Sequence, residues 1–449
     1  MSRVKPGLYS DLVRRCSAVM IVSVVVFMWS AVGITQEAPP ALEFSFSNPG
    51  ARSMGLGGAF VALADDATAA FANPAGLVQL LRPEVSLELR TRQYSTPYTE
   101  GGRASGEPTG LGIDNVDGLR NGSSEDTTTG VSFASFVYPG NRWSLAVYRH
   151  QLADFTLGTE VNGLFGDVRE GETRRYDDNL TSTELDIVGT GISAAYQLSD
   201  RISLGFGLAY YSGGVENQAS VYWIDSYPDT FWEINSFFPE RRVTTSTFLI
   251  DGTDLGFNAG FLWKFAGSWR LGGVYRKGPR FDYDLYTRAG PAHPQPEGTV
   301  LASVTDHSIA FPDVWGLGVT YRSPDGNLTV GFEWDRVDYS VIKETLDSPL
   351  ADTSMVAIDD ADELHLGVEY VFLNTSPLIA VRGGLWHDPD HRFRYIGDDP
   401  FDQALFPPGE DATHIAIGIG IAVKTFQVDV GADLSDRSDV FALSAIYSF

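Results

Sequence analysis

Histidines and acidic residues are the first places to look for chemistry in this sequence. His387 and His391 flank Asp388, Pro389 and Asp390, and imidazoles interleaved with carboxylates could bind a metal ion. An exposed acidic loop is the interpretation that we favour for this stretch. The seven histidines are scattered over positions 150, 293, 307, 365, 387, 391 and 414. We therefore expect no catalytic site, no metal site and no cofactor, and hence no enzyme.

Aromatic side chains offer a second kind of chemistry, the binding of apolar molecules. Seven of them, with few charges nearby, crowd the stretch 213–252, which we expect to be a long loop: Tyr222, Trp223, Tyr227, Phe231, Trp232, Phe237 and Phe238. Contiguous exposed apolar surface usually marks a ligand or partner site. We take five of the seven as ligand-binding candidates: Trp223, Phe231, Trp232, Phe237 and Phe238. The alternatives are that these rings pack against one another or lie at a membrane interface.

The N-terminal segment and the net charge exclude several classes of protein. Residues 1–33 have the features of a secretory signal, because four basic residues precede the apolar run 18–29 and small residues follow at 31–33. A retained signal anchor is the alternative, since the run is long. The only cysteine, Cys16, lies in this segment, so we expect no disulfide scaffold or Cys-based metal site. The net charge of −26 argues against nucleic acid as a partner.

The elements that must position these residues are strands. Fourteen segments alternate apolar and polar residues with a period of two. They are 84–94, 130–138, 142–155, 184–198, 201–212, 255–265, 269–275, 315–321, 328–334, 364–372, 379–385, 415–423, 426–430 and 441–449. Short turns join twelve of them into six pairs, and long connections separate the pairs. This pattern is typical of an outer-membrane barrel, whereas a soluble β-sandwich has no reason to show it. We predict an all-β fold, a transmembrane antiparallel β-barrel of about 14 strands in a Gram-negative type of outer membrane.

The two faces of these strands differ in chemistry. If the apolar face contacts lipid, the other face carries charges of both signs, among them Arg276, Arg322 and Arg382. Charges are costly on the lipid side of a bilayer but are tolerated in a wet lumen. The last strand ends at Tyr447-Ser448-Phe449, which is similar to the C-terminal signal read by the barrel assembly machinery. We therefore expect that machinery, outer-membrane lipid and lipopolysaccharide as partners.

A glycine-rich segment, 48–77, comes directly before the first strand. Its centre can form one or two short helices, and Asn73-Pro74 is a helix-stopping pair because proline disfavours a helical conformation in the residue before it. We interpret the segment as a plug, with a small helical subdomain of a soluble β protein as the alternative. Small residues would let a plug approach the wall closely and still rearrange. We expect bulky replacements at Gly57 and Gly58 to impair that movement and leave barrel assembly intact.

At this point the chain resembles the FadL family of outer-membrane transporters for long-chain fatty acids and other hydrophobic compounds. The matching segments are ADDA at 64–67, NPAG at 73–76, WRLGGVYRKGP at 269–279, FPDVWGLGVTYR at 311–322 and LIAVRGGLWHDP at 378–389. The resemblance implies a fourteen-stranded barrel with an N-terminal, partly helical hatch in the lumen. We accordingly divide the chain into a signal peptide (1–33), a hatch (34–83) and a barrel (84–449). The glycine-rich segment also looks like that of PorV-type barrels, which serve protein secretion.

The resemblance implies a passive uptake channel for long-chain fatty acids or other hydrophobic small molecules. Loops would capture the ligand, a site above the hatch would hold it, and a local rearrangement of the hatch would open a path. The residues that we assign to this gate are Gly57, Gly58, Asp65, Asp66, Asn73, Pro74 and Ala75. A ligand carboxylate would pair with Arg276, Arg322 or Arg382. The alternative for these arginines is a lumenal salt bridge or a contact to the plug.

Overall fold

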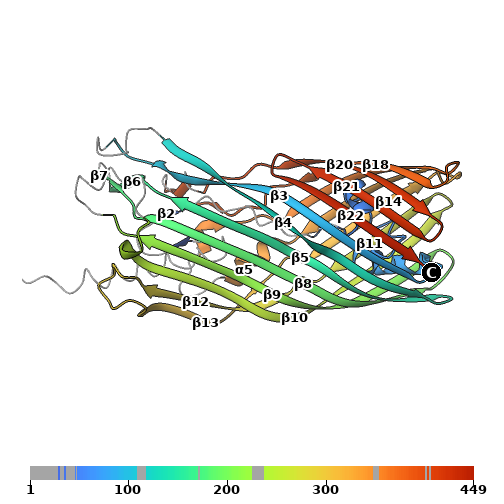
Figure 1. Cartoon of the computed structure of the whole chain (residues 1–449), viewed down its shortest axis with the longest axis horizontal. Coiled ribbons are helices and arrows are strands. Elements are labelled where there is room, and N and C mark those ends of the chain that lie inside the picture. Colours follow the sequence, from blue (N-terminus) through green and yellow to red (C-terminus); the bar gives the residue numbers. More distant parts are fainter. Residues whose placement is uncertain are drawn as a thin grey trace, which may run out of the picture.

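The computed structural model describes residues 29–30, 35–36, 46, 48–108, 118–169, 172–224, 237–346, 353–399, 402–403 and 406–449. Apart from Trp29–Ser30 (β1), which pairs with Thr35–Gln36 (β2), the predicted signal peptide lies outside the described residues. The chain forms a closed antiparallel barrel with the glycine-rich segment inside it (Figure 1). No helix in the described part of the chain is long and apolar enough to cross a membrane.

The wall consists of sixteen hydrogen-bonded segments. They are β3 (Glu84–Arg103), β4 (Gly118–Pro139), β5 (Trp143–Val161), β8 (Asp178–Gln197), β9 (Ile202–Tyr222), β10 (Arg242–Ala266), β11 (Trp269–Arg276), β12 (Arg280–Ala289), β13 (Val300–Ala310), β14 (Val314–Arg322), β15 (Leu328–Val337), β17 (Ala361–Phe372), β18 (Leu378–Asp388), β20 (Ala412–Val423), β21 (Phe426–Leu434) and β22 (Ser438–Ser448). β11 and β12 both pair with β10, one above the other, and together make one wall strand. β14 pairs with β11 and β13 pairs with β12, so β13 and β14 together make the next wall strand. Counted in this way the wall has fourteen strands, and pairing of β22 with β3 closes it. The predicted barrel is confirmed.

Smaller elements decorate the two ends and the lumen. They are β6 (Leu164–Arg169), β7 (Glu172–Arg175), β16 (Val356–Ala357), β19 (Arg394–Tyr395), α3 (Ala51–Gly55), α4 (Ala69–Ala72), α5 (Ser340–Leu346), η1 (Pro74–Gln79), η2 (Pro239–Arg241) and η3 (Thr353–Met355). The short turns gather at one end of the barrel, together with the C-terminus, and the long connections lie at the other (Figure 1).

The stretch 213–252 is not the long loop that the alternation predicts. β9 continues to Tyr222 and β10 begins at Arg242, so about half of this stretch is strand. In β9 the apolar residues change from the outer to the inner face of the wall at residues 212–214. On the short-turn side of this level the outward residues are apolar. On the long-loop side the outward residues include Glu216 and Gln218, while Val215 is buried. A strand that leaves the membrane but still encloses an apolar lumen must reverse its pattern in this way.

The lumen accordingly has two levels. At the long-loop level, inward-facing apolar residues from β5 to β15 form one buried cluster that includes Phe155, Ile187, Phe248 and Tyr283. At the short-turn level the inward residues are polar or small, and the hatch fills the space. The mixed-charge lumen that the sequence predicts therefore describes the level of the hatch, and the level above it is largely apolar.

The hatch is a chain of short turns and helices with its own apolar centre. Leu56, Phe60, Leu63 and Phe71 are buried and pack toward the wall residue Phe133. α4 ends at Ala72 and the 3-10 helix η1 begins at Pro74, as the helix-stopping pair predicts. The segment therefore lies in the lumen as a plug.

Candidate functional site

A ring of glycines on the lumenal face of the wall receives the backbone of the hatch. Nine successive wall strands, from β9 round to β21, contribute one glycine each: Gly205, Gly260, Gly272, Gly318, Gly331, Gly367, Gly384, Gly418 and Gly431. A methyl carbon added to any of them would lie within 3.3 Å of a hatch atom. Because glycine has no Cβ, hatch backbone packs directly on wall backbone around most of the barrel.

Two glycines of the hatch meet this wall in conformations that favour glycine. Gly57 has φ of +59° and Gly58 has φ of +84°. A Cβ on Gly57 would lie 2.9 Å from the Leu385 backbone nitrogen, and one on Gly58 would lie 2.8 Å from His365 Nδ1. Bulky replacements at these positions would therefore act first on the docking of the closed hatch, which refines the effect on movement expected from the sequence.

Glu333 of β15 is the main acceptor for the hatch. Its carboxylate accepts hydrogen bonds from the backbone N–H groups of Phe60 at 2.7 Å and Val61 at 2.6 Å, and from Asn48 Nδ2 at 2.9 Å. Glu333 is 1% exposed. Charge-assisted hydrogen bonds in so dry a position are among the stronger ones in proteins, so this carboxylate fixes the middle of the hatch.

Arg276 of β11 binds both ends of the hatch at once. Its guanidinium donates to Asn48 Oδ1 at 2.6 Å and to the Ala72 carbonyl at 2.9 Å. It also lies over the ring of Phe71, 5.1 Å from the centroid. This arginine thus contacts the plug, which is the alternative role that the sequence left open.

A network of ion pairs links the hatch to β14, β17 and β18 of the wall. Hatch Arg52 pairs with Asp65 at 2.6 Å and with Glu369 of β17 at 2.9 Å, and Arg382 of β18 joins through Glu369 at 2.7 Å. Arg322 of β14 contacts Asp65 at 2.7 Å. Burial alone would raise the pKa of Asp65, but Arg52 and then Arg322 outweigh it and hold that pKa well below its ordinary range. The hatch and three wall strands therefore share one charge network.

Asp66 has a more local role than Asp65. Its carboxylate accepts from the backbone N–H of Thr68 at 3.0 Å and from the Thr68 hydroxyl at 2.5 Å, which orders the turn before α4. Burial raises the pKa of Asp66 above its ordinary value. Both acids of the hatch contact Arg52, Asp65 at 2.6 Å and Asp66 at 3.3 Å, and Asp66 in addition caps the turn before α4.

The Asn73-Pro74-Ala75 corner anchors the end of the hatch. Asn73 donates to the Val61 carbonyl at 2.9 Å and to the Phe261 carbonyl of β10 at 3.1 Å, and its side-chain oxygen accepts from the Ala75 N–H at 3.1 Å. Ser203 of β9 donates to the Ala75 carbonyl at 2.9 Å. Asn73 is fully buried, so every polar atom of its amide is used to hold the corner.

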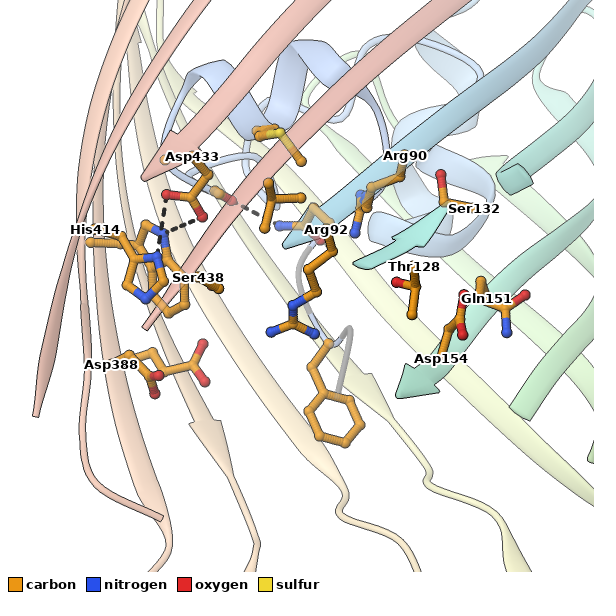
Figure 2. A pocket seen from close by; sticks show the side chains of 18 of the residues that line it. Arg90, Arg92, Thr128, Ser132, Gln151, Asp154, Asp388, His414, Asp433 and Ser438 are labelled. Carbon is orange, nitrogen blue, oxygen red and sulfur yellow. Dashed lines mark hydrogen bonds and ion pairs between the residues drawn. The ribbon is translucent and has the colours of Figure 1, made fainter. Parts of the chain in front are cut away.

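A cavity of about 140 Å³ lies directly above the hatch. Met54, Gly57 and Gly58 of the hatch contribute to its lining, and Trp386, His391 and other residues of the wall and the long-loop end enclose it. Figure 2 shows Arg92 of β3 reaching into the middle of this space, with Arg90 nearby and Asp388, His414 and Asp433 opposite. The sequence analysis missed Arg90 and Arg92, although they share the inward parity of Glu88 in the first strand and that parity could have identified them.

The cavity reaches a seam in the wall. Backbone pairing between β4 and β5 runs only from Pro139–Ser144 to Phe133–His150, although both strands continue well beyond. Above that level β4 pairs with β3, and β5 pairs with β8. Thr128 on one side of the seam and Gln151 and Asp154 on the other line the cavity (Figure 2). Side-chain hydrogen bonds, such as the one from the Thr156 hydroxyl to the Asp126 carboxylate, link the two strands here in place of backbone hydrogen bonds.

The aromatic ligand-binding candidates lie at the long-loop end. Trp223 and Phe238 are 48% and 47% exposed, and Phe237 packs edge-on against Tyr222 with ring centroids 5.3 Å apart. Phe231 and Trp232 lie outside the described residues. The structure therefore places three of the five candidates next to the long-loop ends of β9 and β10, well away from the three arginines.

Comparison with protein families identifies the group to which the sequence belongs. Residues 40–435 match the outer membrane protein transport protein family, OMPP1/FadL/TodX. The chain belongs to this family. FadL-family membership and the closed barrel together confirm the resemblance stated from the sequence and the location in the outer membrane.

Solved structures share the fold of this FadL-family member at low sequence identity. A FadL homologue from Pseudomonas aeruginosa is 16% identical, with a TM-score of 0.61, over 91% of this chain and 99% of that one. The CymD monoaromatic hydrocarbon channel is 16% identical with a TM-score of 0.56 over 91% and 99%. The Pseudomonas putida toluene transporter TodX is 14% identical with a TM-score of 0.56 over 90% and 99%. A comparison with curated protein sequences gives no match.

Proposed function

We propose that this outer-membrane transport protein is a passive uptake channel, and not an enzyme, for long-chain fatty acids or other hydrophobic small molecules such as aromatic hydrocarbons. The observation that carries the proposal is the continuity between the apolar upper lumen and the cavity above the hatch. Phe46 and Tyr339 belong to both, with ring centroids 6.1 Å apart. A hydrophobic molecule that moves from the long-loop end to the hatch would therefore meet apolar side chains.

The entrance is the aromatic surface at the long-loop end. Trp223, Phe237 and Phe238 offer apolar contact to a molecule that has crossed the hydrated surface of the outer membrane. Phe231 and Trp232 belong to the same predicted capture site. Replacement of Trp223 and Phe238 together by serine should slow uptake at low ligand concentration and have less effect at saturation, because capture limits the rate only when ligand is scarce.

The cavity above the hatch suits a molecule with a small polar or aromatic head. Its volume of about 140 Å³ is close to that of an engineered apolar cavity, about 150 Å³, that binds benzene. Arg92 lies where it would meet a carboxylate, while the stacked rings of Tyr339 and His391, 4.2 Å apart, offer an aromatic wall. A fatty acid and an aromatic hydrocarbon would therefore use different parts of one cavity.

The hatch is the gate on the direct path to the periplasm. Gly57, Gly58, Asp65 and the Asn73-Pro74-Ala75 corner hold it against the wall, with Asp66 ordering its central turn. Arg276, Arg322 and Arg382 are engaged by the hatch or its ion-pair network. We assign these three arginines to holding the closed hatch, and a ligand carboxylate would compete for them only when the hatch moves.

The seam between β4 and β5, which begins where the apolar outer wall ends, is the proposed exit at the outer edge of the membrane. The cavity meets the wall where no backbone ladder closes it, so a hydrophobic ligand can leave sideways without passage through the hatch. A cysteine pair at Asp126→Cys and Thr156→Cys, whose side chains are in contact, should close the seam on oxidation and reopen it on reduction. Thr159→Cys with Thr181→Cys is the matched control, because those residues already pair in the β5–β8 ladder.

Uptake of a labelled fatty acid and of labelled toluene, by cells with and without the gene and by liposomes containing the purified protein, tests the function. Uptake that depends on the protein supports the channel. Unchanged uptake in the deletion strain, together with loss of a surface-exported protein, would reject it in favour of the PorV-like role. Oxidation that blocks the seam pair and spares the control pair supports lateral exit, and equal uptake by both pairs would reject that route alone.

The remaining proposed partners concern assembly. The C-terminal strand presents Tyr447 and Phe449 outward, at 48% and 55% exposure, where the barrel assembly machinery would read them. The apolar outer wall would contact outer-membrane lipid and lipopolysaccharide. Replacement of Phe449 by serine should lower the amount of folded barrel in the membrane without changing uptake per folded molecule.

A further inference from the structure

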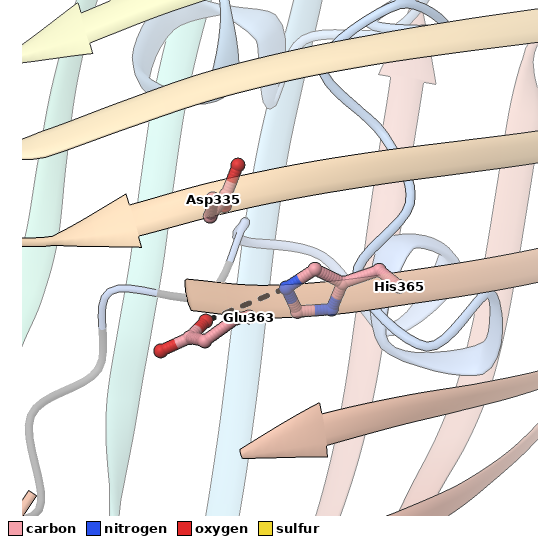
Figure 3. Close-up of side chains that lie close together, drawn as sticks. All are labelled: Asp335, Glu363 and His365. Atoms are coloured by element: carbon pink, nitrogen blue, oxygen red, sulfur yellow. Dashed lines mark ion pairs between the residues drawn. The ribbon is translucent and has the colours of Figure 1, made fainter. Parts of the chain in front are cut away.

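Two buried carboxylates and one buried imidazole of the wall lie close together where the wall contacts the hatch. Asp335 of β15 is the register partner of Glu363 in β17, and His365 follows Glu363 by two residues on the same lumenal face. One ligand-type atom from each lies within 4.8 Å of the others (Figure 3). Asp335 and His365 are 5% exposed and Glu363 is 9% exposed. Strand register alone therefore brings an imidazole and two carboxylates together in a dry place.

The tautomer of His365 is set by the hatch. Its Nδ1 lies 2.8 Å from the carbonyl oxygen of Gly57, which can only accept, so Nδ1 carries a hydrogen. In a neutral ring Nε2 then has its lone pair directed into the cluster, 3.4 Å from Glu363 Oε2. Neither Nε2 nor Asp335 Oδ1 has a hydrogen-bond partner within the described part of the chain. Nε2 and Glu363 Oε2 can lie this close in a buried site only with a cation between them, which is either a second proton on the imidazole or a metal ion.

We propose that Asp335, Glu363 and His365 bind one divalent transition-metal ion of the Zn²⁺ type. Two ligands bound to one tetrahedral zinc at about 2.0–2.1 Å are about 3.4 Å apart, which is the separation of Nε2 and Oε2. An imidazole ligand favours zinc and its neighbours over Mg²⁺ and Ca²⁺, which prefer a full set of oxygens. Glu363 and His365 also line the cavity above the hatch, so a fourth position is open to water or to a ligand there.

The ion would also stabilise the docked hatch. Metal-bound histidines characteristically donate their other ring N–H to a carbonyl or carboxylate, and here that acceptor is Gly57 of the hatch. Binding at Nε2 makes the Nδ1 hydrogen a stronger donor and neutralises part of the acidic cluster that Glu333 shares. An ion that binds only when the hatch is docked stabilises the docked state by mass action. This step rests on the contacts of the hatch and does not depend on the proposed transport.

The test uses the full-length protein in detergent, stripped with a chelator and titrated with Zn²⁺, with bound metal counted by mass spectrometry. We expect one ion per chain, binding weakened by about tenfold or more in Glu363→Gln and His365→Gln, and no weakening in His414→Gln. His414 is the matched control because it is buried, lines the same cavity and lies 3.3 Å from an acid, Asp433. No binding by the wild-type protein, or binding unaffected by His365→Gln, would overturn the site and leave a proton shared by His365 and Glu363.

Two further measurements keep the proposal testable should a variant fail to fold. The absorption spectrum of the wild-type protein loaded with Co²⁺ should show the bands of a four-coordinate site with mixed nitrogen and oxygen ligands, and a spectrum equal to that of hydrated Co²⁺ would count against it. Amide hydrogen exchange at Gly57 and Gly58 should slow on addition of Zn²⁺ in the wild-type protein and in His414→Gln. Stoichiometric binding without slower exchange would reject the coupling to the hatch.

Discussion

A single methyl group on the glycine ring should undock the hatch. In the closed state a Cβ on Gly384 would lie 2.3 Å from the backbone nitrogen of Gly57, which is about 1.1 Å inside the 3.4 Å at which ordinary contact begins. The atom in the way belongs to backbone on both sides, so the hatch must move as a whole. A shift of about 1 Å directed away from the wall stretches the 2.8 Å hydrogen bond from His365 to Gly57 beyond the length of a useful bond.

The cost can be estimated from these contacts. Overpacking a tight interface costs about 1–3 kcal/mol, and the strained hydrogen bond adds about 1 kcal/mol at most. A central value of about 2 kcal/mol shifts the equilibrium between docked and undocked hatch by about 30-fold. Gly384→Ala should therefore increase amide exchange in residues 55–62 by about that factor and raise the permeability of the channel to small solutes.

The neighbouring residue supplies a matched control. A Cβ on Gly383, on the outward side of the same strand, would meet nothing within 4 Å. Gly383→Ala and Gly384→Ala lower the entropy of the unfolded chain alike, so only contact with the hatch separates them. Both variants should form folded barrels by gel mobility before and after heating. Equal amide exchange rates in the hatch of the two variants would refute the reasoning, since they would mean that the hatch can accommodate an added methyl group at the wall.

Three other perturbations address separate contacts. Glu333→Gln gives the Phe60 and Val61 N–H groups an uncharged amide oxygen in place of a carboxylate and should destabilise the docked hatch by about 1–3 kcal/mol, measured as faster amide exchange at Val61; unchanged exchange would show that Glu333 is not the main anchor. Arg92→Gln should slow fatty-acid uptake about tenfold and leave toluene uptake unchanged, and equal losses for both ligands would argue for a structural role. Burial raises the pKa of Asp177, in the loop before β8, to about 6, so the folded loop binds this proton more tightly than the unfolded chain. Loop stability should be highest below about pH 4 and fall as the pH rises to about 6. Exchange of the Ile224 N–H, corrected for its intrinsic rate, should therefore become faster over this pH range, and in Asp177→Asn this pH dependence should disappear.

Much of the barrel could be predicted from the sequence because its physical cause is local. A strand in a membrane wall must alternate lipid-facing and lumen-facing residues, so each of the fourteen wall strands carries its own pattern. The helix-stopping Asn73-Pro74 pair is local in the same way, because proline restricts the residue before it. The alternation predicts strands that end at Ser212 and begin at Leu255, whereas the strands of the structure extend to Tyr222 and from Arg242. The prediction stops short because the strands leave the membrane there and their apolar side faces inward.

Only the tertiary structure decided what the lumenal residues do. Glu333 and Phe60 are 273 positions apart, and their hydrogen bond exists because the hatch folds back against β15. Nothing in the spacing of His365 and Asp335 suggests a shared site, since pairing of two strands brings them together. The unpaired seam between β4 and β5 is likewise invisible to periodicity, which records the faces of a strand and not its neighbours. The sequence by itself determined which residues face inward, and the register and the docked hatch determined their partners.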